Sequence, residues 1–95
     1  MKKIRILVIE DNRLLRDGIV AMINEQEDLR IVAALENQEK VHPKITETKP
    51  DIVLIDLGLQ GKNSLQLVRK IKLDFPEVKI IVMDLLPLQQ DIYEF

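Results

Sequence analysis

The sequence contains no cysteine. Disulfides, thiolate metal sites and cysteine nucleophiles are therefore excluded. No apolar run approaches the roughly 20 residues of a membrane-spanning helix, and the run that follows the first three residues is too short for a secretory signal peptide. We expect a cytoplasmic protein that does not enter a membrane.

Basic residues do not outnumber acidic residues in this sequence. The chain has 14 Lys and Arg against 16 Asp and Glu, a net charge of -2 and a pI of about 5.4. No basic stripe can follow a phosphate backbone, so we expect no direct nucleic-acid binding by this chain. There is no Walker loop and no grouping of Ser, His and Asp, and the sequence therefore does not favour an enzyme.

What is present is enough apolar sequence for one small core. The 95 residues have a mass of 11.0 kDa, and 46% of them are apolar while 32% are charged. This balance is typical of a globular domain, and the length is too small for two cores. Residues 1–95 are thus expected to form a single domain.

Short apolar runs rich in β-branched residues recur along the chain, at 6–9, 31–35, 52–55 and 80–83. Their length and composition predict strands that are buried on both faces of a sheet. Helical periodicity separates them. Residues 14–23 repeat apolar side chains after the capping residue Asn12, and residues 65–75 do so until Pro76 ends the pattern.

Two further segments carry weaker helical signals. Residues 36–49 have few apolar anchors, so Pro43 is placed in the first turn of a short or bent helix, after a loop. Residues 84–87 predict a loop, and the last eight residues predict two helical turns. The alternation of strands and helices predicts an α/β fold with a parallel sheet covered on both faces.

Three carboxylates follow the two most apolar strands of this predicted sheet. Glu10 and Asp11 end the first strand, and Asp56 ends the third. If these strands are neighbours, the strand order begins 2-1-3 and the three carboxylates meet at the point where the winding direction of the chain reverses. Open α/β sheets bind their ligands at this point. Hard oxygen ligands without His or Cys favour Mg²⁺ with a phosphate group. Asp56 is the expected nucleophile, although acidic residues at strand ends are also common as solvated loop residues.

The sequence resembles the receiver domain of two-component response regulators, most of all that of LuxR-type regulators. The resemblance is carried by residues 4–12, 49–57 and 75–83 and covers nearly the whole chain. It implies a flavodoxin-like sheet of order 2-1-3-4 and a phosphoryl group transferred to Asp56 from a sensor histidine kinase. It also implies that Mg²⁺ is held by Glu10, Asp11, Asp56 and the carbonyl oxygen of Gly58.

The chain departs from the family pattern at three places. Asp84 occupies the switch position where the family has Ser or Thr, and Gln60 stands where Pro is usual. The sequence ends at Phe95, so the resemblance implies a truncated receiver without output domain, fifth strand, fifth helix or catalytic lysine. We expect the edge of the strand at 80–83 and the following helix to favour self-association.

Two functions stay open at this point. The chain is either a phosphoacceptor module of a phosphorelay or a phosphorylation-independent interaction or dimerisation module on the same scaffold. A dehalogenase-like phosphatase is not favoured, because it needs an acid where Gly58 stands. The single histidine, His42, is interpreted as a solvated loop residue.

Overall fold

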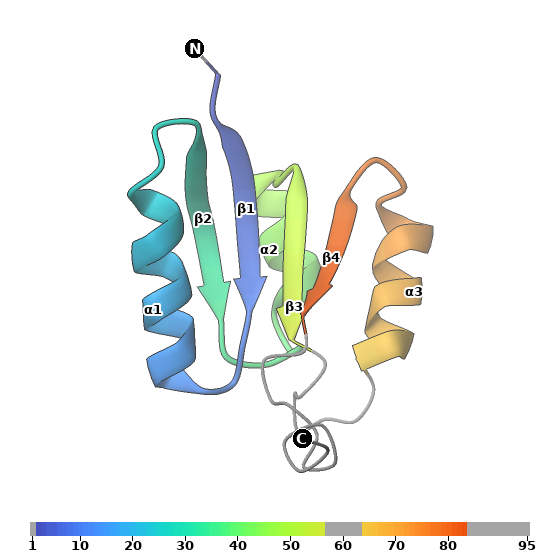
Figure 1. Ribbon diagram of the computed structural model, residues 1–95. Helices are drawn as coiled ribbons and strands as arrows, with labels where there is room; N and C mark the ends of the chain where they lie inside the picture. Colours follow the sequence, from blue (N-terminus) through green and yellow to red (C-terminus); the bar gives the residue numbers. More distant parts are fainter. Residues whose placement is uncertain (1, 57–63, 84–95) are drawn as a thin grey trace, which may run out of the picture.

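The structure, a computed structural model, describes residues 2–56 and 64–83. Within these residues four strands and three helices alternate along the chain (Figure 1). They are β1 (Ile4–Ile9), α1 (Arg13–Asn24), β2 (Leu29–Leu35), α2 (Val41–Thr48), β3 (Ile52–Asp56), α3 (Ser64–Asp74) and β4 (Lys79–Met83). The four predicted strands and the helices between them are confirmed.

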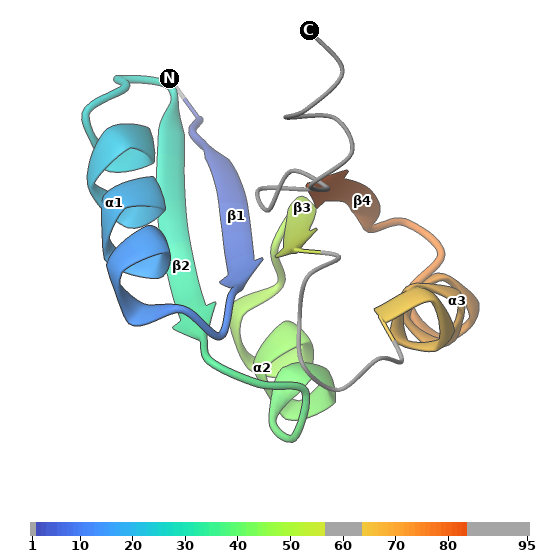
Figure 2. The same ribbon diagram turned by 60° about the horizontal axis from the view of Figure 1, so that its bottom comes forward.

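The strands form one parallel sheet in the order β2-β1-β3-β4. This order confirms the predicted flavodoxin-like α/β fold, with the first and third strands at the centre. The chain winds from β1 to β2 in one direction and to β3 and β4 in the other, so the winding reverses between β1 and β3. Figure 2 turns the carboxyl ends of the strands toward the viewer.

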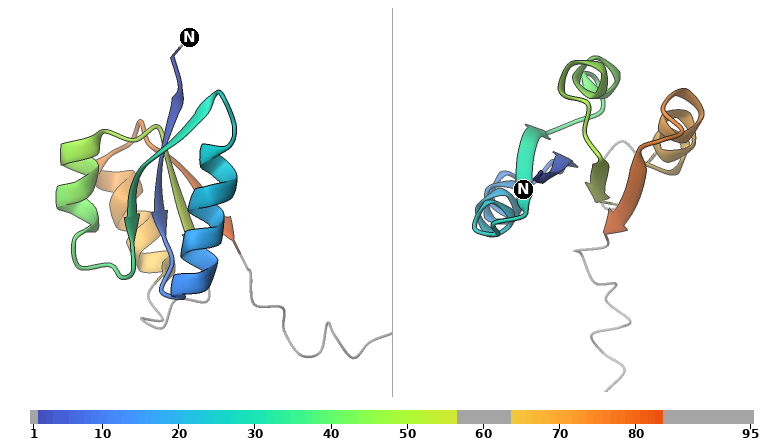
Figure 3. Two further views of the ribbon diagram at one scale, coloured as in Figure 1. Left: turned by 90° about the vertical axis from the view of Figure 1, so that its left-hand side faces the viewer. Right: turned by 90° about the horizontal axis from the view of Figure 1, so that it is seen from above.

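Helices cover both faces of the sheet. Figure 3 shows α1 on one face, with α2 and α3 on the other. Alternate residues of β1 serve the two layers: Leu7 and Ile9 join the core under α2 and α3, while Ile6 and Val8 join the core under α1. This alternation follows from the two-residue period of a strand and explains why nearly every β1 residue is apolar.

Local signals place the ends of the helices. Asn12 caps α1, since its Oδ1 accepts the Leu15 N–H at 3.0 Å. Pro43 lies at the third position of α2, where no intrahelical N–H is needed, as predicted. Helix α2 ends at Thr48 and is capped by Lys49, whose φ of 49° is the left-handed conformation common just after helix ends.

The interpretation of His42 as a solvated loop residue is wrong. His42 is the second residue of α2, and its Nε2 lies 2.9 Å from Asp74 Oδ2 at the end of α3. Its ring also contacts that of Phe75, with 5.5 Å between centroids. His42 therefore ties the two helices on one face of the sheet together.

The predictions for residues 84–95, a loop followed by a short helix, lie outside the described residues. The statements on a fifth strand and fifth helix stay predictions. Among the helices that the structure does describe, none combines the length and the apolar character that crossing a membrane requires.

Candidate functional site

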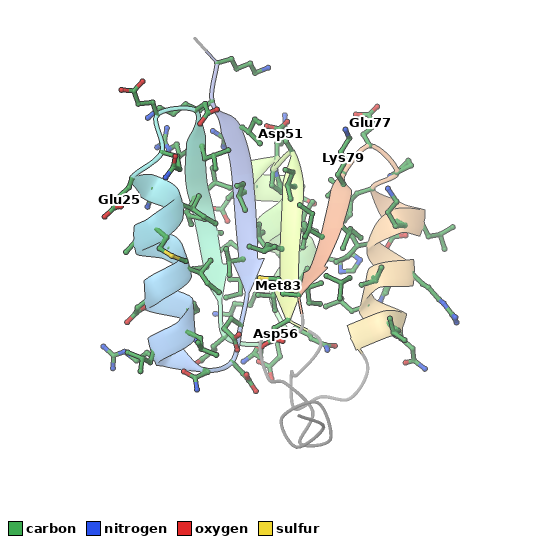
Figure 4. The ribbon with its side chains drawn as sticks, viewed as in Figure 1. Glu25, Asp51, Asp56, Glu77, Lys79 and Met83 are labelled. Atoms are coloured by element: carbon green, nitrogen blue, oxygen red, sulfur yellow. The ribbon has the colours of Figure 1, made fainter. Side chains whose placement is uncertain are left out.

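The candidate site lies where the two central strands end. The register of β1 and β3 pairs Ile9 with Ile55, so Glu10 and Asp56 each follow a paired residue on adjacent parallel strands. Both acidic residues are buried, with 0% of Glu10 and 1% of Asp56 exposed. Figure 4 shows Asp56 at the carboxyl end of β3, beside Met83 of β4. Two buried carboxyl groups thus occupy the winding reversal of the sheet.

A network of hydrogen bonds holds the loop between β1 and α1. The Glu10 N–H donates to Leu35 O of β2 at 2.9 Å, and the Asn12 N–H donates to Glu10 Oε2 at 2.9 Å. Arg16 Nη1 of α1 donates to Glu10 O at 2.9 Å. Glu10 is therefore fixed through its main chain and through one side-chain oxygen.

The carboxyl group of Glu10 has a strongly shifted pKa. Burial raises the pKa of Glu10 from 4.5 to about 7, and hydrogen bonds with the side chains of Asp56 and Asp11 act in the same direction. The N–H of Asn12 opposes this shift and lowers the pKa. A hydrogen bond between two carboxyl groups requires a proton on one of them, and the raised pKa of Glu10 is in keeping with this requirement.

The chemistry of the site suits a small divalent cation. Glu10 Oε1 is buried, and no described group donates a hydrogen bond to it. Mg²⁺ prefers carboxylate oxygen, takes one or two carboxylates and keeps several waters. Residues 2–56 and 64–83 do not form a closed cluster of three or more acidic, His or Cys side chains around a cation, and Asp11 is exposed at the rim. The buried carboxyl groups of Glu10 and Asp56 are thus the part of the described site whose oxygen atoms suit Mg²⁺ as ligands.

Two of the residues predicted for the site, Gly58 and Asp84, lie outside the described residues. Glu10, Asp11 and Asp56 are described, and Glu10 contacts the other two through its side chain. The sequence reasoning missed Arg16. Its signal was weak, because one arginine on the first turns of an amphipathic helix is usually solvated.

A cavity between described residues lies away from these carboxylates. It has a volume of about 830 Å³ and is lined at the amino end of the sheet by residues that include Asp51, Glu77 and Lys79, which Figure 4 places at the end opposite Asp56. In the described part of the chain, the buried side-chain atoms without a hydrogen-bond partner are Glu10 Oε1 and Gln38 Nε2, and neither residue lines this cavity. The buried Glu10 Oε1 without a hydrogen-bond donor therefore favours a ligand site at the carboxyl end of the sheet over this cavity.

The chain matches the family described as the response regulator receiver domain over residues 6–86. It is 34% identical over 80 residues to the response regulator GacA of Pseudomonas viridiflava, which covers 84% of this chain and 37% of that protein. It is 32% identical over 80 residues to the oxygen regulatory protein NreC of Staphylococcus haemolyticus, covering 83% and 37% respectively. The chain thus spans well under two thirds of the length of these relatives.

Solved structures show the same fold. A LuxR-family two-component response regulator from Aurantimonas sp. SI85-9A1 superposes with a TM-score of 0.81 at 23% identity, over 96% of this chain and 65% of that one. The response regulator domain of Thermotoga maritima CheB gives a TM-score of 0.76 at 25% identity, over 85% and 60%. The fold, the family match and the two sequence relatives agree: the chain belongs to the response regulator receiver domain family.

Proposed function

We propose that this receiver domain is the phosphoacceptor module of a two-component response regulator, with Asp56 as the residue that is phosphorylated. The observation that carries this proposal is the buried contact between the carboxyl groups of Glu10 and Asp56 at the carboxyl ends of β1 and β3. Two buried carboxylates repel each other unless a proton or a cation lies between them. In the proposal Mg²⁺ is held by Glu10, Asp11 and Asp56, with the carbonyl oxygen of Gly58.

Asp56 acts as a nucleophile in this reaction. One of its carboxylate oxygens forms a bond to phosphorus while the bond between phosphorus and an imidazole nitrogen of a sensor histidine kinase breaks. Bound Mg²⁺ supplies compensation for the negative charge on the phosphoryl oxygens. Glu10 and Asp11 orient the site, and the acyl phosphate adds negative charge at the carboxyl edge of the sheet.

Features of its relatives support a proposed role for the whole protein. GacA and NreC are response regulators or regulatory proteins longer than this chain. RcsB from Salmonella enterica, which shares the fold, has been solved bound to the promoter rprA. We therefore assign to this domain the control of a DNA-binding transcription regulator in the cytoplasm, with no nucleic-acid contact of its own.

A second candidate is an interaction module that works without phosphorylation. Asp84 stands where the family has a hydroxyl, and an acid there repels a phosphoryl group. In the described part of the sheet, β4 pairs with β3 alone, and Ile81 and Val82 are 48% and 40% exposed. Strand edges of this kind favour self-association through β4 and the segment that follows it.

Phosphorylation in solution separates the two candidates. The protein is incubated with Mg²⁺ and a small phosphodonor such as acetyl phosphate, and the intact mass is measured. The phosphoacceptor function predicts one added phosphoryl group that is lost in Asp56→Asn and kept in Asp28→Asn, a matched change at an exposed aspartate. An unchanged mass for the wild-type protein, together with a concentration-dependent dimer in sedimentation, would support the interaction module instead.

A further inference from the structure

Glu10 offers four polar groups, and three of them are fixed by other residues. Its N–H donates to Leu35 O, its carbonyl oxygen accepts from Arg16 Nη1, and its Oε2 accepts from the Asn12 N–H, each at 2.9 Å. Its Oε1 is buried and receives no hydrogen bond from the described residues. The three bonds therefore fix the main chain of Glu10 and one of its two carboxylate oxygens.

The bond from Arg16 differs from the other two. It is made by a side chain of α1, whereas the other donor and acceptor belong to the main chain. The carbonyl oxygen of Glu10 and the N–H of Asp11 belong to one planar peptide unit. A guanidinium that donates to this oxygen therefore fixes the orientation of the peptide that joins Glu10 to Asp11, just before Asn12.

Arg16 is itself well anchored for this task. Its N–H donates to Asn12 O at 2.9 Å in the first turn of α1. Its backbone and its side chain therefore both bond to the segment that links β1 to α1. Its side chain is half-buried. A hydrogen bond from a charged donor is stronger than one between neutral groups, which makes the Glu10 carbonyl a firm attachment point.

We propose that Arg16 is a positioning residue that locks the peptide between Glu10 and Asp11, and so presents their carboxylates to a divalent cation beside Asp56. This inference rests on the proposed function, because it assigns to Arg16 a part in cation binding at that site. Arg16 does not touch the cation or the phosphoryl group. It acts by holding the main chain that carries the ligands.

The chain offers a matched control on the same helix. Arg13 lies one turn away, its side chain is 87% exposed, and it pairs with Asp17 at 3.7 Å on the surface of α1. Arg13→Met and Arg16→Met remove the same charge and the same donors from α1. Arg16→Met also removes the bond to Glu10 O, whereas Arg13→Met also removes an exposed pair with Asp17. The comparison therefore separates the bond to Glu10 O from a general loss of positive charge on α1.

The test is a titration of each variant of the 95-residue chain with Mg²⁺ by calorimetry, with amide hydrogen exchange at Asn12 and Leu15 followed by NMR in the absence of Mg²⁺. We expect Arg16→Met to weaken Mg²⁺ binding about tenfold and to speed exchange at both amides, because partners of metal ligands contribute on this scale. Arg13→Met should stay within about twofold of the wild type.

Equal Mg²⁺ affinity and equal exchange in Arg16→Met and Arg13→Met would overturn the proposal. Arg16→Lys keeps the positive charge and N–H donors on a shorter side chain without the planar guanidinium. It guards against a variant that fails to fold, and it should give an intermediate Mg²⁺ affinity. If the wild-type protein bound no Mg²⁺, the proposed function would fail and cation positioning by Arg16 would fail with it. Loss of affinity only in the Arg16 variants would support the inference whatever the source of the phosphoryl group.

Discussion

Glu10 and Asp56 end adjacent parallel strands, one residue beyond the paired positions Ile9 and Ile55, and bring two fully buried carboxyl groups into contact. The sheet order is responsible, since β1 and β3 are neighbours although Glu10 and Asp56 lie 46 residues apart in sequence. Such a pair is costly in the folded protein unless a proton or cation compensates it. This cost is the source of several measurable properties.

Stability without a divalent cation should depend on pH through Glu10. A carboxyl group whose pKa is raised in the folded state, here to about 7, contributes stability fully below its unfolded value of 4.5 and loses it as the pH rises through about 7. We expect the free energy of unfolding to fall by on the order of 2 to 3 kcal/mol between about pH 5 and about pH 8 in chelator. Urea unfolding measures this slope.

The variant Glu10→Gln should flatten this dependence on pH, because it removes the titrating group and keeps its shape. Asp28→Asn, at an exposed aspartate, should leave the slope as in the wild type. A slope that persists unchanged in Glu10→Gln would show that another group is responsible.

Affinity for Mg²⁺ should rise with pH until Glu10 is ionised. The cation must displace the proton that the raised pKa of about 7 keeps on the site, so binding weakens about tenfold for each pH unit well below that value. Mg²⁺ should accordingly raise the melting temperature more at pH 8 than at about pH 5.5. Thermal melts with and without chelator provide the comparison, and an increase that is larger at the lower pH would contradict it.

Packing of α3 on the sheet can be tested with two residues of that helix. Ile71 is 0% exposed in the core under α2 and α3, whereas Leu73 is 81% exposed. Ile71→Ala should destabilise the domain by about 2 to 5 kcal/mol through lost burial and a cavity, and Leu73→Ala by less than about 0.5 kcal/mol. Similar losses of unfolding free energy in both variants would mean that α3 faces the sheet differently.

Gly18 is a site where the domain can be stabilised. It lies inside α1, and a Cβ at this position would meet nothing within 4 Å. Gly18→Ala should therefore raise the free energy of unfolding by up to about 1 kcal/mol, because alanine loses less backbone entropy in a helix. Denaturant unfolding at fixed pH measures the change, and a destabilised variant would reveal a neighbour of α1 on that face.

Much of this architecture could be predicted from the sequence, because its signals are local. The apolar runs identify the strands, Asn12 marks the start of α1, and Pro43 marks the first turn of α2. The sheet order required one further step, which placed the two most apolar strands together. That step also brought Glu10 and Asp56 to the same edge.

Other features could not be predicted, because they depend on contacts between distant segments. His42 meets Asp74 across 32 positions of sequence, and nothing near His42 indicates that partner. The bond of Arg16 to the Glu10 carbonyl depends on the angle between α1 and β1, which no periodicity encodes. The raised pKa of Glu10 likewise needs its burial to be known.

The central claim is that Glu10 and Asp56 together bind a divalent cation, and a crystal structure of the protein grown with Mn²⁺ in place of Mg²⁺ tests it most directly. Anomalous scattering locates the ion without reference to its surroundings. We expect one peak at the carboxyl ends of β1 and β3, with an oxygen of Asp56 and one of Glu10 or its bound water within about 2.3 Å of the ion. Full occupancy by an ion elsewhere, with the Glu10 and Asp56 carboxyl groups still in contact through a proton, would contradict the account.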